Sequence, residues 1–326
     1  MSTSEITETW LQKICKQLLA LGNETWLTAW ELIRITIPIA IFTKILDEIG
    51  LISIFSQILE PVMELVGLPG SLGIVWATAM LTSIYGGITV LAALAPTLQI
   101  TVAQLTVLCS ITLIAHSLPI ELSVSKRAGA QVLPIAALRL GGGLLYGFLL
   151  HRFCLGFSLW QDQASLIFKA SPSGASIWQW GWEQLQNQIL IVFIIFCIVV
   201  GMKVFRALKL LTLMENILAP ILPWFGMGRQ AAPITVVGMI MGIGYGGALI
   251  IRETTTGKMD RREIFNSMAL MGLCHGLVED TLLMLAIGGK LGGIFWGRII
   301  FSLLVAFLLV KITTYFAKNG TCRIRS

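Results

Sequence analysis

Two histidines are each followed by an acid five residues later. His116 precedes Glu121 in the run Ala-His-Ser-Leu-Pro-Ile-Glu, and His275 precedes Glu279 and Asp280 in the run Cys-His-Gly-Leu-Val-Glu-Asp. Imidazole beside carboxylate suits a divalent transition metal, and it also suits proton relay because histidine titrates near neutral pH. The same groups can hydrogen-bond an organic solute, or can simply hold neighbouring helices together. The sequence leaves these four interpretations open.

The spacing of the acids predicts how they reach the histidines. His275 and Glu279 are four residues apart, which places them on one face of a helix and suits joint coordination of a cation. In the first motif Ser117 and Pro119 loosen the helix, so that Glu121 can turn inward despite its five-residue spacing. The predicted metal ligands are therefore His116, Glu121, His275 and Glu279.

The environment of these motifs is apolar. Of the 326 residues, 56% are hydrophobic and only 12% are charged, whereas a soluble domain has about 25% charged residues. Several stretches reach the roughly 20 residues that span hydrocarbon. The composition predicts an all-α polytopic membrane protein. In such a protein the net charge of +6 is explained by lysine and arginine in cytoplasmic loops, and nucleic-acid binding is not expected. The six cysteines form no C-x-x-C pair, and we expect no disulfides.

The chain contains an internal repeat. Tyr85-Gly86-Gly87 returns as Tyr245-Gly246-Gly247, His116 returns as His275, and Pro61 returns as Pro220. The offsets are 159 or 160 residues, and three ordered matches at one period indicate duplication. The predicted domains are an N-terminal interfacial helix (1–25), a first repeat (26–153), a linker (154–181), a second repeat (182–317) and a basic tail (318–326).

Each repeat is predicted to follow one plan. An apolar helix and a short amphipathic arm precede an apolar stretch broken by Tyr-Gly-Gly, and two long helices close the unit. Those closing helices are expected at Thr101–Val124, Gln131–His151, Glu263–Ile287 and Leu291–Phe316.

Charge placement indicates that the two repeats are inverted. The range 47–94 contains no lysine or arginine, whereas the equivalent range of the second repeat contains Lys203, Arg206, Lys209 and Arg229. Positive charge marks the cytoplasmic side. Both termini are then cytoplasmic. Four basic residues fall on the outer side and count against this topology: Arg152, Lys169, Lys290 and Arg298.

The Tyr-Gly-Gly stretches are predicted to be re-entrant hairpins. The segments before and after each stretch carry charge of one sign, so they lie on one side of the membrane. Two arms of about 11 residues reach roughly 16 Å each, about half the membrane. The double glycine is expected at the tip, leaving three full crossings per repeat; a plain transmembrane helix is the alternative. The predicted substrate site comprises Tyr85, Gly86, Gly87, His116, Glu121, Tyr245, Gly246, Gly247, His275, Glu279 and Asp280.

Short motifs give the chain a family resemblance. Ile37-Pro38-Ile39, Ile58-Leu59-Glu60-Pro61 and Gly67-Leu68-Pro69-Gly70, running into the first Tyr-Gly-Gly, resemble a unit of the nucleoside recognition (Gate) domain family. The stretch from Ile217-Leu218-Ala219-Pro220 to the second Tyr-Gly-Gly resembles another. The family includes spore maturation proteins and is similar to the gates of ferrous-iron and concentrative nucleoside transporters. The resemblance implies a bacterial inner-membrane protein with a transport role.

The sequence therefore predicts a secondary transporter or facilitator. Its substrate would be a nucleoside-like organic solute or a divalent cation, with a proton or sodium left open as the coupling ion. Arg139, deep in an apolar helix, is expected to pair with Glu121 or to serve an anionic solute. A membrane scaffold or assembly factor is the alternative. An enzyme is not expected, since no nucleophile elbow, Walker sequence or H-E-x-x-H is present. The expected partners are the lipid bilayer and the substrate, with a homo-oligomer left open and no cofactor expected.

Overall fold

The computed structural model of the chain describes residues 10–95, 98–168, 176–228, 231–255 and 259–318. This described part is helical throughout, and its one β contact is an isolated bridge between Thr101 and Gln163. The prediction of an all-α chain is confirmed. The predicted basic tail lies outside the described residues except for Lys318, which ends the last helix.

The first half contains seven helices in the described residues. In chain order they are α1 (Trp10–Glu48), α2 (Leu51–Leu65), α3 (Gly70–Leu81), α4 (Ile84–Leu94), α5 (Val102–Ile114), α6 (Leu118–Arg127) and α7 (Val132–Gly156).

The second half follows with the same order of elements. They are α8 (Ile177–Ala207), α9 (Leu210–Leu218), the short η2 (Leu222–Phe225), α10 (Ala231–Met241), α11 (Ile243–Thr255), α12 (Arg261–Leu273), α13 (Glu279–Ala286), the π-helical turn η3 (Gly292–Gly297) and α14 (Arg298–Lys318).

Local signals that start and end these helices recur between the halves. A capping box of Thr101 and Gln104 starts α5, and one of Asp260 and Glu263 starts α12. In each box the first side chain accepts a bond from a free N–H of the helix, and the second reaches back to the cap. The glycines that precede the two hairpins, Gly67 and Gly226, both have positive φ, at 71° and 69°. Equivalent helices in the two halves thus begin at equivalent residues.

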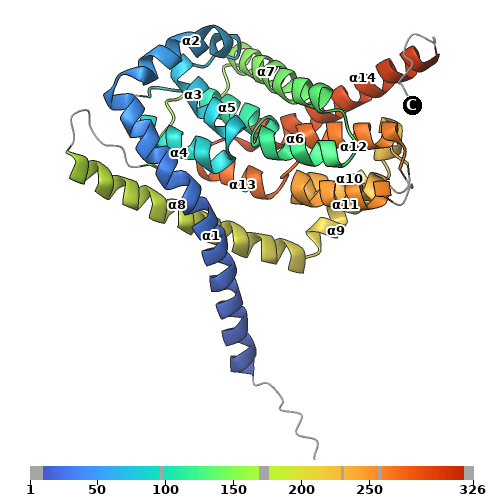
Figure 1. Cartoon of the computed structure of the whole chain (residues 1–326), viewed down its shortest axis with the longest axis horizontal. Helices are drawn as coiled ribbons and strands as arrows, with labels where there is room; N and C mark the ends of the chain where they lie inside the picture. The colour runs from blue at the N-terminus through green and yellow to red at the C-terminus, as the bar shows by residue number, and fades with distance from the viewer. Residues whose placement is uncertain (1–9, 96–97, 169–175, 229–230, 256–258, 319–326) are drawn as a thin grey trace, which may run out of the picture.

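The two halves pack together reciprocally. Helix α7 of the first half contacts α12 of the second, and α5 of the first contacts η3, which begins the last helix of the second. Helices α1 and α8 cross each other on one face of the bundle (Figure 1). A single cluster of buried apolar side chains runs through both halves. Contacts that exchange equivalent elements in this way are what a two-fold axis generates.

Four spans in the described residues are long and apolar enough to cross a membrane. They are Val102–Arg127, Val132–Gly156, Ile177–Ala207 and Gly292–Ile312. A fifth is possible if α2 and α3 count as one span, although they are bent by 91° at their junction. Large apolar side chains such as Phe148, Phe193 and Leu304 are exposed on these helices, as lipid contact requires. We predicted six crossings, and neither α1 nor α12–α13 is among the four.

Three predicted helices differ from the structure. The N-terminal interfacial helix is not a separate element, because α1 runs without a break from Trp10 to Glu48 and projects from the bundle at its start (Figure 1). Pro38 lies within this helix. The predicted helices Thr101–Val124 and Glu263–Ile287 are each broken in two, at residues 115–117 and 274–278.

The Tyr-Gly-Gly stretches do form helical hairpins, but their glycines are not at the tips. The chain turns at Thr82 and Ser83 in the first hairpin and at Gly242 in the second. A few residues later, Gly87 and Gly246 face the opposite arm. A Cβ on Gly87 would lie 2.7 Å from the Cβ of Ala79, and one on Gly246 would collide with Gly238. The glycines therefore let the two arms approach closely.

Candidate functional site

Each histidine lies where a helix is interrupted. The break between α5 and α6 contains His116, and the break between α12 and α13 contains His275. The residue after each histidine has a left-handed backbone, with φ of 48° at Ser117 and 56° at Gly276. Pro119 has no N–H to donate to the preceding turn, which helps to end α5 before it. The sequence predicted one helix across each histidine, loosened by Ser117 and Pro119 in the first half but not broken in either.

The hairpins hold these breaks in place. The N–H of Ser117 donates to the carbonyl of Ala79 in α3 at 2.9 Å, and the N–H of Leu277 donates to the carbonyl of Met239 in α10 at 3.0 Å. The indole of Trp76 donates to the carbonyl of Ala115 at 3.2 Å. A broken helix frees backbone groups that need partners in a low-dielectric interior. Each hairpin supplies such partners to the break in its own half.

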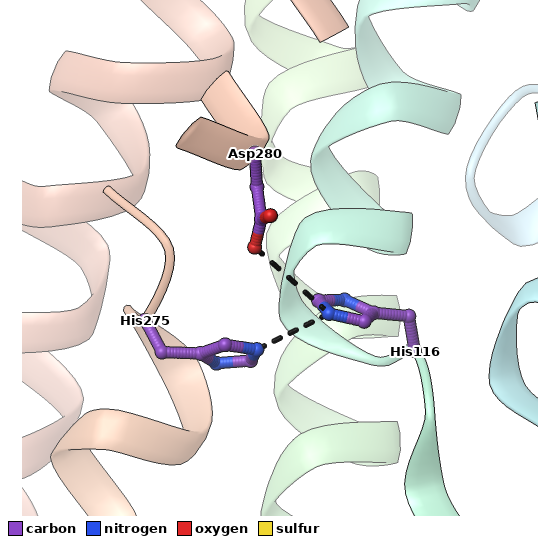
Figure 2. A group of neighbouring side chains, drawn as sticks. All are labelled: His116, His275 and Asp280. Atoms are coloured by element: carbon purple, nitrogen blue, oxygen red, sulfur yellow. Dashed lines mark hydrogen bonds and ion pairs between the residues drawn. The ribbon is translucent and has the colours of Figure 1, made fainter. Parts of the chain in front are cut away.

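The two histidines meet directly, tip to tip. His116 Nε2 lies 3.2 Å from His275 Nε2, and the side chains are almost completely buried (Figure 2). At the other side of each ring, Nδ1 lies 2.9 Å from a backbone carbonyl, that of Thr112 for His116 and that of Met271 for His275. A carbonyl only accepts, so each Nδ1 carries a proton and donates it. In the neutral imidazoles the two Nε2 lone pairs therefore face each other.

Two carboxylates complete the cluster. Glu121 Oε1 lies 3.2 Å from His275 Nε2 and 3.4 Å from His116 Nε2, and Asp280 Oδ2 lies 4.0 Å from His116 Nε2. Figure 2 shows the ring of His275 and the carboxylate of Asp280 both pointing at the ring of His116. Four acceptors thus converge. Such an arrangement is stable when a proton or another cation lies among them.

Arg139 fixes one side of the cluster. Its buried guanidinium donates to the carbonyls of Ile114 and His116, at 2.9 and 3.0 Å, and forms an ion pair with Glu121. The carbonyls at the end of α5 carry partial negative charge, which a cation neutralises. The predicted pairing of Arg139 with Glu121 is confirmed. This residue orients Glu121 and holds the broken end of α5.

Arg298 is a site residue that the sequence reasoning missed. It was placed among the outer basic residues, but it is fully buried at the start of α14. Its Nη2 donates to Thr281 Oγ1 at 3.2 Å, while within the described part of the chain its Nε and Nη1 have no hydrogen-bond partner. Arg298 follows Arg139 by the same 159 residues that separate the histidines. That offset was the signal that could have identified it.

Glu279 does not lie beside His275, where the sequence predicted it. Because the chain is interrupted between His275 and Val278, the helical i, i+4 relation of His275 and Glu279 does not hold. Glu279 is exposed and lines a cavity of about 180 Å³ together with Tyr85, Lys203 and Arg206. Asp280, one residue further, approaches the histidines instead.

The remaining predicted residues divide into two groups. Tyr85 lines the cavity, whereas Gly86, Gly87, Gly246 and Gly247 are buried in the hairpins, where they serve packing. The side chain of Tyr245 lies outside the described residues. The structure thus brings together His116, His275, Glu121 and Asp280, and it separates them from the glycines.

These features define a class: a polytopic helical membrane protein whose two similar halves meet at a buried histidine–carboxylate cluster. Residues 29–130 match the family model described as Gate: Nucleoside recognition. The chain is also 25% identical over 284 residues to the uncharacterized membrane protein YvoD of Bacillus subtilis (strain 168), across 85% of this chain and 88% of that protein. No solved structure matches. The chain is similar to membrane proteins, and the predicted resemblance to the Gate family is confirmed over residues 29–130.

Proposed function

We propose that this protein is a secondary membrane transporter or facilitator for a small solute. The observation that carries the proposal is the meeting of two broken helices at His116 and His275, whose Nε2 atoms are 3.2 Å apart. Ionisable groups inside a membrane bundle are costly and mark ion or substrate pathways. Interrupted helices at the interface of two repeats are the usual substrate site of secondary transporters.

In this proposal the two repeats are inverted. The reciprocal packing of α7 on α12 and of α5 on η3 supports a two-fold relation, and the opposite charge of the equivalent segments supports an axis in the membrane plane. The arms α3 and α4 have 12 and 11 residues, far short of the roughly 20 needed to cross. Short arms of this kind support hairpins that enter and return on one side.

The cavity beside Glu279 is the proposed route to the site. It is lined by α8 near Lys203 and Arg206, at the end of the second repeat's first helix, which positive charge assigns to the cytoplasm. It reaches Glu279, the neighbour of Asp280 in α13. Solute entering from the cytoplasm would therefore arrive next to the histidine pair. We place the protein in the bacterial plasma membrane, with both termini cytoplasmic and an ion gradient driving any uphill transport.

Flux measurements test this function. Purified protein in liposomes is offered a panel of labelled nucleosides and divalent cations, and one tracer should cross faster than in protein-free liposomes. His116→Ala and His275→Ala should abolish that flux. His151→Ala is the matched control, since the chain's third histidine lies outside the cluster.

The rival scaffold function makes the opposite prediction. Variants of the histidine pair that fold normally would keep full activity in cells, and substitutions in the connecting loops would remove it. Flux through both histidine variants at the rate of the unaltered protein would contradict the transport proposal.

A further inference from the structure

We propose that His116, His275, Glu121 and Asp280 bind a divalent transition metal ion of borderline softness, with Zn²⁺ as the type. The inference rests on the proposed function and deepens it, because it names the class of cargo that the central site takes. It replaces Glu279 of the sequence-based ligand set with Asp280.

The distances among three of the donor atoms, the two Nε2 atoms and Glu121 Oε1, fit three corners of a tetrahedral site. Zn–N bonds of about 2.0–2.1 Å at tetrahedral angles place two ligand atoms about 3.3 Å apart. The histidine Nε2 atoms are separated by 3.2 Å, and Glu121 Oε1 is 3.2 and 3.4 Å from them. Asp280 Oδ2 is 4.0 Å from His116 Nε2, so in this proposal its side chain moves closer to the histidines when the ion binds. The donor atoms of His116, His275 and Asp280 lie within 4.8 Å of one another.

The groups behind the ligands are arranged as they are in metal sites. Each imidazole donates Nδ1–H to a carbonyl, which fixes the tautomer that presents a lone pair at Nε2. Arg139 holds Glu121 from the far side, leaving Oε1 toward the histidines. Two imidazoles also select among metals, since Mg²⁺ and Ca²⁺ prefer all-oxygen sites whereas Zn²⁺, Co²⁺ and Ni²⁺ accept nitrogen.

Charge sets a limit on the affinity. Glu121 and Asp280 bring two negative charges to the site, but the charge of Glu121 is already paired with Arg139, whose guanidinium also contacts two carbonyls at the end of α5. A bound divalent ion would therefore leave the site with net positive charge, which lowers its affinity. Buried Arg298 is not offset by an ion pair with Asp280, so it opposes a cation nearby. The positive charge of Arg298 weakens metal binding, so the site would release the ion more readily, as transport requires.

Metal binding to the purified full chain in detergent tests this inference. The chelator-treated protein is titrated with Zn²⁺ by calorimetry and with Co²⁺ by visible absorption. We expect one ion per chain and the intense absorption of four-coordinate Co²⁺. His116→Ala and His275→Ala should each weaken Zn²⁺ binding at least about 100-fold, because one of two nitrogen ligands is lost. His151→Ala should bind as the unaltered protein does.

Other outcomes separate this inference from the proposed function. Zn²⁺ affinity that is unchanged in both histidine variants, or no binding by a correctly folded protein, would overturn the metal site. If such a protein still moved an organic solute in liposomes, the transport function would stand without it. Zn²⁺ bound at the histidines but never moved across the liposome membrane would support the site and contradict transport. Gel filtration and thermal unfolding of each metal-free variant confirm that it is folded.

Discussion

Glu121 and Arg139 in the first half, and Asp280 and Arg298 in the second, occupy equivalent places, but only Glu121 and Arg139 form an ion pair. In the first half Arg139 contacts the carboxylate and two backbone carbonyls. In the second, Arg298 donates to the hydroxyl of Thr281, and Asp280 turns toward His116. Aspartate is one methylene shorter than glutamate, and its side chain is more exposed here, 22% against 12%.

This difference teaches that duplication need not produce two identical half-sites. The first half supplies a fixed wall, in which a buried ion pair fastens the end of a broken helix. The second half supplies the carboxylate of Asp280, which lies against Gly276 and 4.0 Å from His116 Nε2. A ligand in the cluster would therefore meet one carboxylate that is ion-paired and one that is not.

Arg139→Met should have the largest effect of any change at the site. It leaves Glu121 as an uncompensated buried charge and removes the donor from two carbonyls, which costs about 3–5 kcal/mol. Thermal unfolding in detergent measures this loss. If Arg298→Met lowered the stability by as much, the two arginines would play the same structural role and the proposed difference between the halves would be wrong.

The two histidines should contribute equally to Zn²⁺ affinity, whereas the acids should not. Because both rings donate Nδ1–H to a carbonyl and present Nε2, His116→Ala and His275→Ala should lose Zn²⁺ affinity to within about threefold of each other. Calorimetric titration of the two proteins side by side makes the comparison. A large difference would mean that the rings are not equivalent ligands.

The two neighbouring acids of α13 should differ. Asp280→Asn should weaken Zn²⁺ binding at least about tenfold, whereas Glu279→Gln should change the equilibrium affinity by less than about twofold. Neither change should lower the unfolding temperature of the metal-free protein by much, since no ion pair of Asp280 with Arg298 is lost. If Glu279→Gln weakened Zn²⁺ binding more than Asp280→Asn did, Glu279 would be the ligand, as the helical spacing predicted.

Arg298→Met should have the smallest effect, and in the opposite direction. Removing a buried charge that lacks an ion-pair partner is neutral or stabilising, by up to about 1 kcal/mol. Zn²⁺ affinity should rise roughly two- to fivefold as repulsion of the cation falls. Weaker binding in this variant would indicate that Arg298 positions Asp280 rather than opposing the ion.

Much of the architecture could be predicted from the sequence, because it depends on composition and on a repeat. The apolar content predicted a helical membrane protein, and the offset between His116 and His275 predicted that they belong to one site. The pairing of Glu121 with Arg139 followed from burial of two opposite charges. These are properties of residue type and order.

The misses came from local backbone geometry. The left-handed residues Ser117 and Gly276 break the helices, and this break moves Glu279 away and brings Asp280 in. Helical periodicity cannot detect such an interruption, since it assumes an unbroken helix. Loop charge places Arg298 on the outer side, whereas its 159-residue offset from Arg139 matches its buried position.

Side-specific labelling tests the central claim, that the two halves are oppositely oriented around one shared site. Glu48 and Ala207, the exposed last residues of α1 and α8, are equivalent positions. Glu48→Cys and Ala207→Cys are made in a chain whose six cysteines are replaced, and intact cells are treated with a membrane-impermeant thiol reagent. The account predicts that the first is labelled from outside and the second only after the membrane is opened. Labelling of both from the same side would contradict it.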